Sequence, residues 1–115
     1  MKGGSRAQPV FQISGTVEEQ ETGRPLAGLI VRAFDRDLLF DDKVGFATTD
    51  RDGRFEIRFR TEDFSDLRES RPDLYLRVYD TEGTGLLYET TDAIRWNASA
   101  DEHYRLRIPA RSLGR

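Results

Sequence analysis

The chain has 115 residues, of which 37% are hydrophobic and 34% charged, with a formal net charge of -3 at pH 7, as expected of one globular domain with a charged surface. The small net charge is unlike that of a disordered chain, and the lack of a basic excess argues against nucleic-acid binding. The absence of cysteine excludes disulfides and zinc sites built from thiolates.

In chain order, residues 1–8 come first and are polar and rich in small side chains. We expect a flexible N-terminal tail there, a domain over residues 9–109 and a C-terminal tail over residues 110–115. The first segment lacks the apolar stretch of a secretory signal, and no window approaches the ~18 apolar residues of a membrane span. We therefore expect a soluble protein with no signal peptide or membrane span, cytoplasmic by default.

Apolar and polar residues alternate with a period of two along most of the chain, which predicts β-strands. Arg54–Arg60 is the clearest case, because three apolar residues alternate with charged ones and give one core face and one solvent face. The predicted strands are 11–17, 29–33, 44–49, 54–60, 74–79, 86–88 and 105–108. Thr61 and the acidic residues after it predict a short helix near residues 62–69. Seven strands separated by turn residues predict an all-β antiparallel sandwich.

A tight turn is predicted between the third and fourth strands. Asp50 can close this turn through its side chain, Gly53 can take a positive φ, and Phe55 then enters the core.

Aspartates are concentrated on the connections that flank the third strand. If these connections lie at the same end of the sandwich, their carboxylates converge and supply the oxygen ligands that calcium prefers. The candidate calcium ligands are Asp35, Asp37, Asp41, Asp42 and Asp50. The alternative interpretation is that aspartate is simply a good turn residue and that neighbouring cations neutralise the group.

A second candidate surface consists of arginines and tyrosines on the outward parity of several strands. They predict a basic stripe that binds a protein partner or an anionic glycan; the alternative is a solvated sheet face. Trp96, in an irregular segment, is either a contact residue or a plug for the core. The candidate partner-binding residues are Arg58, Arg77, Tyr75, Tyr79, Arg105, Arg107 and Trp96.

The single histidine, His103, has no nucleophile and acid fixed around it by the sequence, and it is interpreted as a surface residue at a strand edge.

Four stretches carry a family likeness: G-T-V-x5-G-x-P-L-A-G over residues 15–28, V-x-A-x-D-x-D-x3-D-D over 31–42, T-D-x-D-G-x-F over 49–55 and P-D-L-x-L-x-V over 72–78. Together they resemble a transthyretin-like domain and are similar to carboxypeptidase regulatory-like domains. This resemblance implies a seven-stranded prealbumin-type sandwich.

Among such domains, the hydroxyisourate hydrolases use several histidines and a C-terminal Tyr-Arg-Gly-Ser motif. This chain has one histidine and ends in Arg-Ser-Leu-Gly-Arg, so that activity is not carried over. The resemblance predicts a non-catalytic accessory module that binds a protein or glycan, alone, as a homodimer joined at sheet edges, or within a larger assembly. The alternative function is calcium binding, and a hydrolase ranks third.

Overall fold

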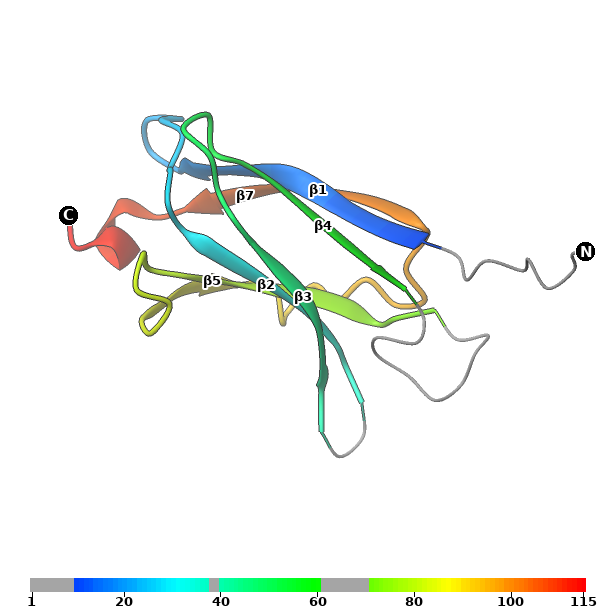
Figure 1. The fold of residues 1–115 in the computed structure, drawn as a ribbon. Coiled ribbons are helices and arrows are strands. Elements are labelled where there is room, and N and C mark those ends of the chain that lie inside the picture. Colours follow the sequence, from blue (N-terminus) through cyan, green and yellow to red (C-terminus); the bar gives the residue numbers. More distant parts are fainter. Residues whose placement is uncertain (1–9, 38–39, 61–70) are drawn as a thin grey trace, which may run out of the picture.

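The computed structural model describes residues 10–37, 40–60 and 71–115, which form seven β-strands in two sheets (Figure 1). The strands are β1 (Val10–Glu19), β2 (Ile30–Asp35), β3 (Asp42–Thr48), β4 (Arg54–Arg60), β5 (Leu74–Tyr79), β6 (Leu86–Glu89) and β7 (Asp101–Ile108). The prediction of an all-β chain with seven strands is confirmed. The helix expected near residues 62–69 lies outside the described residues.

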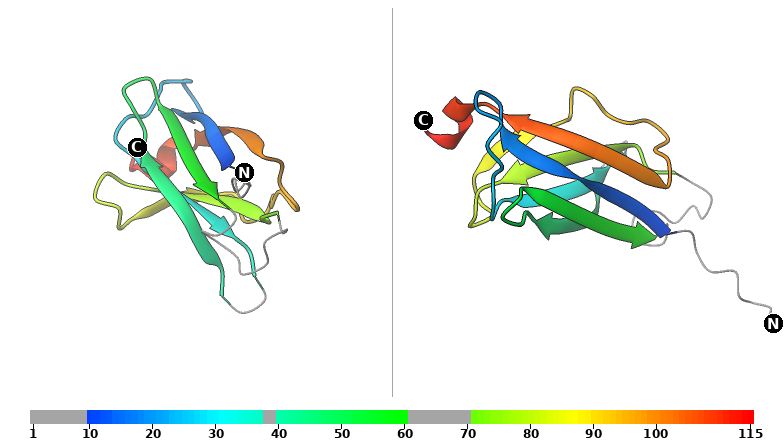
Figure 2. Two further views of the ribbon diagram at one scale, coloured as in Figure 1. Left: turned by 45° about the vertical axis from the view of Figure 1, so that its right-hand side comes forward. Right: turned by 90° about the horizontal axis from the view of Figure 1, so that it is seen from above.

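The two sheets lie face to face (Figures 1 and 2). One has the strand order β4-β1-β7 and the other has the order β3-β2-β5-β6. β1 pairs antiparallel with β4 but parallel with β7, so the prediction of a wholly antiparallel sandwich is wrong at this pair. Alternation of apolar and polar residues assigns the faces of a strand but not its partner or direction. β1 and β7 are the first and last strands, so no short connection in the sequence indicates that they pair.

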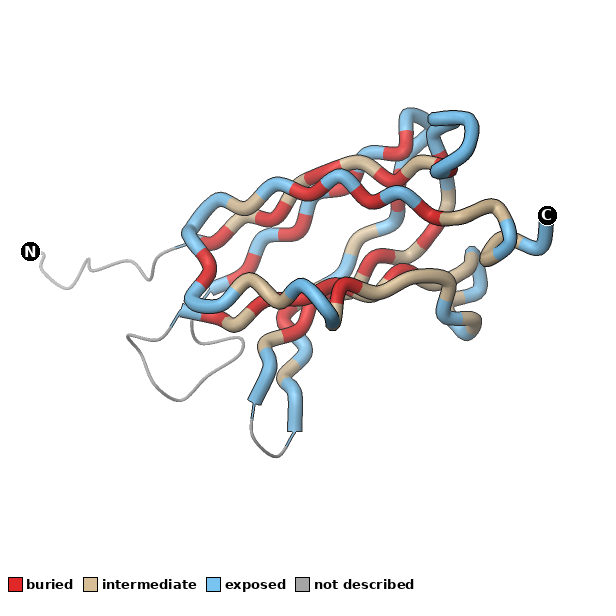
Figure 3. The backbone as a smooth tube through the Cα atoms, turned by 180° about the vertical axis from the view of Figure 1, so that it is seen from behind, coloured by how far each residue is buried: buried red, intermediate tan, exposed pale blue. Residues whose placement is uncertain are grey.

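The core lies between the sheets, where the inward residues of each strand alternate with exposed ones (Figure 3). β4 shows this pattern in full: Phe55, Ile57 and Phe59 are buried while the charged residues between them are exposed. Gly15 of β1 allows the backbone of β7 to lie close beside it, because a Cβ there would lie 2.1 Å from the carbonyl oxygen of Tyr104.

The β3–β4 connection crosses from one sheet to the other. Gly53 has a φ of 73° in this turn, and a Cβ on it would lie 2.5 Å from the carbonyl oxygen of Val17. Asp50 accepts hydrogen bonds at Oδ1 from the backbone N–H groups of Asp52 and Arg54. The turn thereby fixes β3 beside the edge of the three-stranded sheet.

Two features extend the sandwich. The β2–β3 hairpin projects from the body of the domain (Figure 1). At the C-terminal end, where the sequence analysis expected a tail, Ala110–Leu113 forms a 3-10 helix, η2, and Leu113 packs against the core.

Among the residues that the structure describes, no helix is long and apolar enough to cross a membrane.

Candidate functional site

The outer face of the β4-β1-β7 sheet presents three rows of polar side chains. The strand register sets these rows, because residues paired across neighbouring strands lie side by side on one face. The rows are Arg58–Gln12–Asp101, Glu56–Ser14–His103 and Arg54–Thr16–Arg105.

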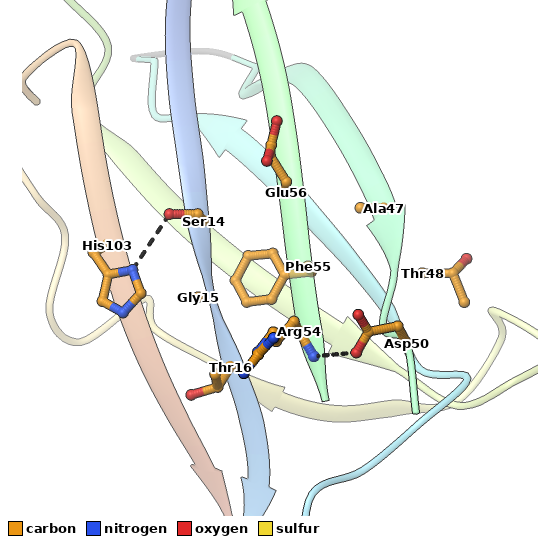
Figure 4. Close-up of a pocket in the computed structure, with 10 residues that line it drawn as sticks. All are labelled: Ser14, Gly15, Thr16, Ala47, Thr48, Asp50, Arg54, Phe55, Glu56 and His103. Atoms are coloured by element: carbon orange, nitrogen blue, oxygen red, sulfur yellow. Dashed lines mark hydrogen bonds between the residues drawn. The ribbon is translucent and has the colours of Figure 1, made fainter. Parts of the chain in front are cut away.

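An open depression of about 500 Å³ lies over the last two rows, where β3 passes the edge of this sheet (Figure 4). Its walls come from β1, β3, β4, β7 and the β3–β4 turn. The lining residues are Ser14, Gly15, Thr16, Ala47, Thr48, Asp50, Arg54, Phe55, Glu56 and His103.

Ser14 and His103 face each other across β1 and β7, with 3.3 Å between Ser14 Oγ and His103 Nδ1 (Figure 4). A hydroxyl beside an imidazole can donate its proton to the ring or accept one from it. The pair therefore supplies both a hydrogen-bonding group and a proton-transfer group at the floor of the depression.

The two carboxylates that line the depression, those of Glu56 and Asp50, each bind another group of the protein. Glu56 forms an ion pair of 2.6 Å with Arg58. The hydrogen bond from the backbone N–H of Arg54 lowers the pKa of Asp50, so this carboxylate is held in its charged form.

Arg54 is the exception. Its guanidinium makes no hydrogen bond or direct ion pair with any other residue that the structure describes, although its charge also lowers the pKa of Asp50. Arg105, in the same row, is bound by Glu18 at 2.9 Å. Among its described lining residues, the depression therefore contains one guanidinium without a direct hydrogen-bond or ion-pair partner, and the hydroxyls of Ser14, Thr16 and Thr48 line the same depression.

The predicted calcium ligands are divided between two ends of β3. Asp35 and Asp42 form the last pair before the loop of the β2–β3 hairpin, whereas Asp50 follows the opposite end of β3. Asp41 accepts hydrogen bonds from the Tyr75 hydroxyl at 2.6 Å and from the backbone N–H of Asp37 at 3.0 Å. Within the described ranges, no group of three or more acidic or histidine side chains is placed to hold a metal ion.

The carboxyl group of Asp35 is the most perturbed of these aspartates. Burial raises its pKa to about 6, and the charges of Asp73, Asp42 and Asp37 act in the same direction. Asp35 Oδ1 accepts a hydrogen bond of 2.8 Å from the backbone N–H of Asp73. Asp35 is therefore a partly buried carboxyl group whose ionisation is disfavoured by burial and by its acidic neighbours.

The predicted arginine and tyrosine stripe is divided between the two sheets. Arg58, Arg105 and Arg107 lie on the three-stranded sheet and are paired with glutamates. The others lie on β5 of the four-stranded sheet, where Tyr75 is only 2% exposed and Arg77 pairs with Glu89. The sequence assigned outward faces to these residues but could not assign the sheets. Tyr79 is also on β5, beneath the guanidinium of Arg32.

Trp96 lies between β6 and β7 with 65% of its surface exposed, which excludes the alternative of a core plug.

Ser14, Thr16 and Glu56 were missed as site residues, and His103 was assigned only a surface role. The outward parity of each was visible in the sequence. Their convergence depends on the parallel β1–β7 pairing, for which the sequence offered no signal.

No protein-family model and no curated protein matches the chain. Among solved structures, a 9R-lipoxygenase from Cyanothece PCC8801 matches 85% of this chain with a TM-score of 0.62 and 24% identity. The match covers 16% of the lipoxygenase chain, so this chain spans only a small part of that protein.

Two further structures are similar over more of this chain but with lower TM-scores. A 3-chlorocatechol 1,2-dioxygenase from Rhodococcus opacus 1CP matches 95% of this chain and 62% of its own, with 16% identity and a TM-score of 0.49. The dioxygenase domain of a dioxygenase carbohydrate-binding protein fusion from Streptomyces sp. SirexAA-E matches 94% of this chain and 83% of its own, with 18% identity and a TM-score of 0.47.

These matches correct the prediction of a non-catalytic binding module that is not an enzyme. The structure with the TM-score of 0.62 is named as a lipoxygenase, so the lack of a familiar hydrolase motif was not a sound reason to exclude catalysis. At these identities the matches show the fold alone, and a fold does not specify an activity.

Proposed function

We propose that the depression on the outer face of the β4-β1-β7 sheet binds a small molecule that carries an oxyanion, such as a carboxylate or a phosphate. The observation that carries this proposal is Arg54, an uncommitted guanidinium that lines the depression beside two engaged carboxylates. A guanidinium presents several N–H donors in a planar fork, which matches carboxylate and phosphate oxygens.

The hydroxyl groups beside Arg54 supply further hydrogen-bond donors for a bound oxyanion. Thr16 is paired directly with Arg54 across β1 and β4, and Ser14 lies one row further along the same face. Each hydroxyl can donate one hydrogen bond to an oxyanion. His103, 3.3 Å from Ser14, adds a proton-transfer group beside the bound ligand.

Phosphate and acetate titrations followed by ¹H–¹⁵N NMR test this proposal, with sodium chloride holding the ionic strength constant. We expect saturable shifts at the amides of Ser14, Thr16, Arg54 and His103. Arg54→Gln should weaken binding about tenfold, equivalent to ~1.4 kcal/mol.

Arg107→Gln is the matched control, because Arg107 is on the same sheet face but outside the depression. It should leave both titrations unchanged. An equal loss in the two variants would mean general attraction to a charged surface, and unchanged binding in Arg54→Gln would also refute the site. Phosphate binding without acetate binding would restrict the ligand class to phosphates.

The lipoxygenase match favours a second, wider candidate function: the chain works as a β-sandwich domain of an oxygenase-class protein. What supports it is the TM-score of 0.62 over 85% of this chain, against 16% of the lipoxygenase chain.

Immunodepletion from an extract of the source organism tests this second candidate. An antibody against the chain should remove an oxygen-uptake activity together with a species much larger than 13.2 kDa. Depletion of a free species of about that mass, with oxygen uptake unchanged, would reject it.

For the architecture, we propose the prealbumin-type topology and membership of the transthyretin-like domains. The division into three and four strands, with the long β1 central in its sheet, supports this proposal together with the four sequence stretches described above.

A further inference from the structure

A second cleft, of about 280 Å³, lies where η2 approaches the start of β2 and the β5–β6 turn. It shares no lining residue with the depression on the three-stranded sheet. The lining residues are Leu26, Ala27, Leu29, Asp80, Thr81, Leu87, Ser112, Leu113 and Arg115.

The floor of this cleft consists of leucines that belong to the hydrophobic core or pack against it. Leu26 and Leu29 are 8% and 7% exposed and belong to the core, whereas Leu87 and Leu113 are half-buried and pack against it. These four leucines come from three separate parts of the chain. The apolar surface still exposed at Leu87 and Leu113 favours an aliphatic ligand, since removing such surface from water stabilises the bound state.

The charged groups at the rim are already neutralised or engaged. Arg115 pairs with Glu19 at 2.8 Å. The two carboxylate oxygens of Asp80 accept hydrogen bonds from the backbone N–H groups of Thr84 and Gly85, each at 3.1 Å. Because Glu19 balances the charge of Arg115, the Asp80 carboxylate is the one unbalanced charge among the described lining residues, and it disfavours an anionic ligand.

Two rim hydroxyls are uncommitted. Neither the Thr81 nor the Ser112 side chain has a hydrogen-bond partner among the described residues of the chain, and both line the cleft. A hydroxyl can both donate and accept a hydrogen bond, so this rim suits a neutral polar head group.

We propose that this cleft binds a small aliphatic molecule with a neutral hydroxyl-bearing head, its chain on the four leucines and its head at Thr81 and Ser112. The cleft is slightly smaller than a typical small-molecule pocket of roughly 300–1,000 Å³, so the ligand is smaller than a drug-sized compound. Ser112 and Leu113 belong to η2, so this helix forms one wall of the site.

An NMR titration of the whole chain with 1-hexanol tests the proposal, with sodium hexanoate as the charged counterpart. Hexanol should give saturable shifts at the amides of Ala27, Thr81, Leu87 and Leu113. Hexanoate should bind several-fold more weakly because the Asp80 carboxylate at the rim repels its charge. Hexanoate binding as tight as hexanol would overturn the neutral-head assignment.

Ala27→Leu is the blocking variant, because Ala27 is exposed and lines the cleft, so that a larger side chain fills it without disturbing the core. It should weaken hexanol binding about tenfold, which is ~1.4 kcal/mol. Ala93→Leu, at an exposed alanine outside the cleft, is the matched control and should bind hexanol normally. Unchanged hexanol binding in Ala27→Leu would overturn the site.

The double variant Thr81→Val, Ser112→Ala tests the head group separately. It retains the aliphatic floor and should bind hexanol several-fold more weakly than the natural chain. Equal affinity would mean that the two hydroxyls play no part in recognition.

Discussion

At the scale of single residues, Tyr104 combines a buried ring with an unsatisfied hydroxyl. The residue is 4% exposed, and its hydroxyl has no hydrogen-bond partner among the residues described. Burial raises its pKa to about 12. The Arg95 guanidinium lies 3.6 Å from the ring centroid, a contact that needs the ring and not the hydroxyl.

Tyr104→Phe should therefore leave stability unchanged or raise the free energy of unfolding by up to about 1 kcal/mol, because it removes a buried donor that lacks a partner. Urea denaturation measures the change. Tyr104→Ala, which removes the ring as well, should lose about 3–5 kcal/mol. A loss above ~1 kcal/mol in the phenylalanine variant would show that the hydroxyl has a partner.

At the scale of elements, two aspartates join the β2–β3 hairpin to β5 with opposite electrostatic consequences. Asp35 has a pKa raised from 3.8 to about 6, chiefly by burial. Asp41 has a lowered pKa, chiefly because the Tyr75 hydroxyl donates a hydrogen bond to it. Ionisation of Asp35 is therefore opposed by burial and by the neighbouring aspartates, whereas ionisation of Asp41 strengthens its hydrogen bond from Tyr75.

The sign of the Asp35 effect follows from linkage. The unfolded chain releases this proton at a lower pH than the folded protein, so the free energy of unfolding should fall as pH rises from about 4 to 6. Because Asp35 is partly exposed, solvent screening limits the loss to about 1 kcal/mol. Asp35→Asn retains the oxygen that accepts from the Asp73 N–H and should abolish this part of the decline.

Thermal melts between pH 4 and 7 measure this prediction, with Asp41→Asn as the control on the same hairpin. The folded-state pKa of Asp41 is depressed, so its contribution is present near neutral pH and is lost as pH falls through that pKa. Asp41→Asn should thus be less stable than the natural chain at pH 7, whereas Asp35→Asn should be more stable. The same change in both variants would contradict the assignment of opposite shifts.

At the scale of the whole molecule, the strands could be predicted from the sequence but their partners could not. Arg54–Arg60 was predicted with its observed bounds because charged and apolar residues alternate without interruption. The β1–β7 pairing is parallel and joins distant parts of the chain, and nothing in a local period encodes it. The candidate site depends on that pairing, since only it brings His103 to Ser14.

The same limit affected the predicted surfaces. Arg77 and Arg105 have equal outward parity in the sequence, yet β5 and β7 belong to different sheets. Asp42 and Asp50 are eight positions apart, but the extended β3 strand places them at opposite ends. The sequence thus indicated which residues face outward from each strand. Which of them lie together depends on the order and pairing of the strands.

The C-terminal segment, residues 110–115, contacts β1 and the turn that follows it. Arg115 pairs at 2.8 Å with Glu19, whose side chain is 5% exposed, and the backbone N–H of Ala110 donates to Glu21 Oε1 at 2.8 Å. The Thr22 hydroxyl and the Arg115 guanidinium lower the pKa of Glu19. Leu113 adds half-buried apolar contact with the core.

Deletion of residues 110–115 should lower the melting temperature by several degrees, with about 1 kcal/mol lost from the Leu113 contact alone. It also leaves Glu19 charged and without its cation. Glu19→Gln should therefore recover part of the loss in the shortened chain but destabilise the full chain, where the ion pair is intact. Calorimetry of the four proteins measures this coupling, and equal effects of Glu19→Gln in the two backgrounds would show that Glu19 of β1 is not stabilised by the C-terminal segment.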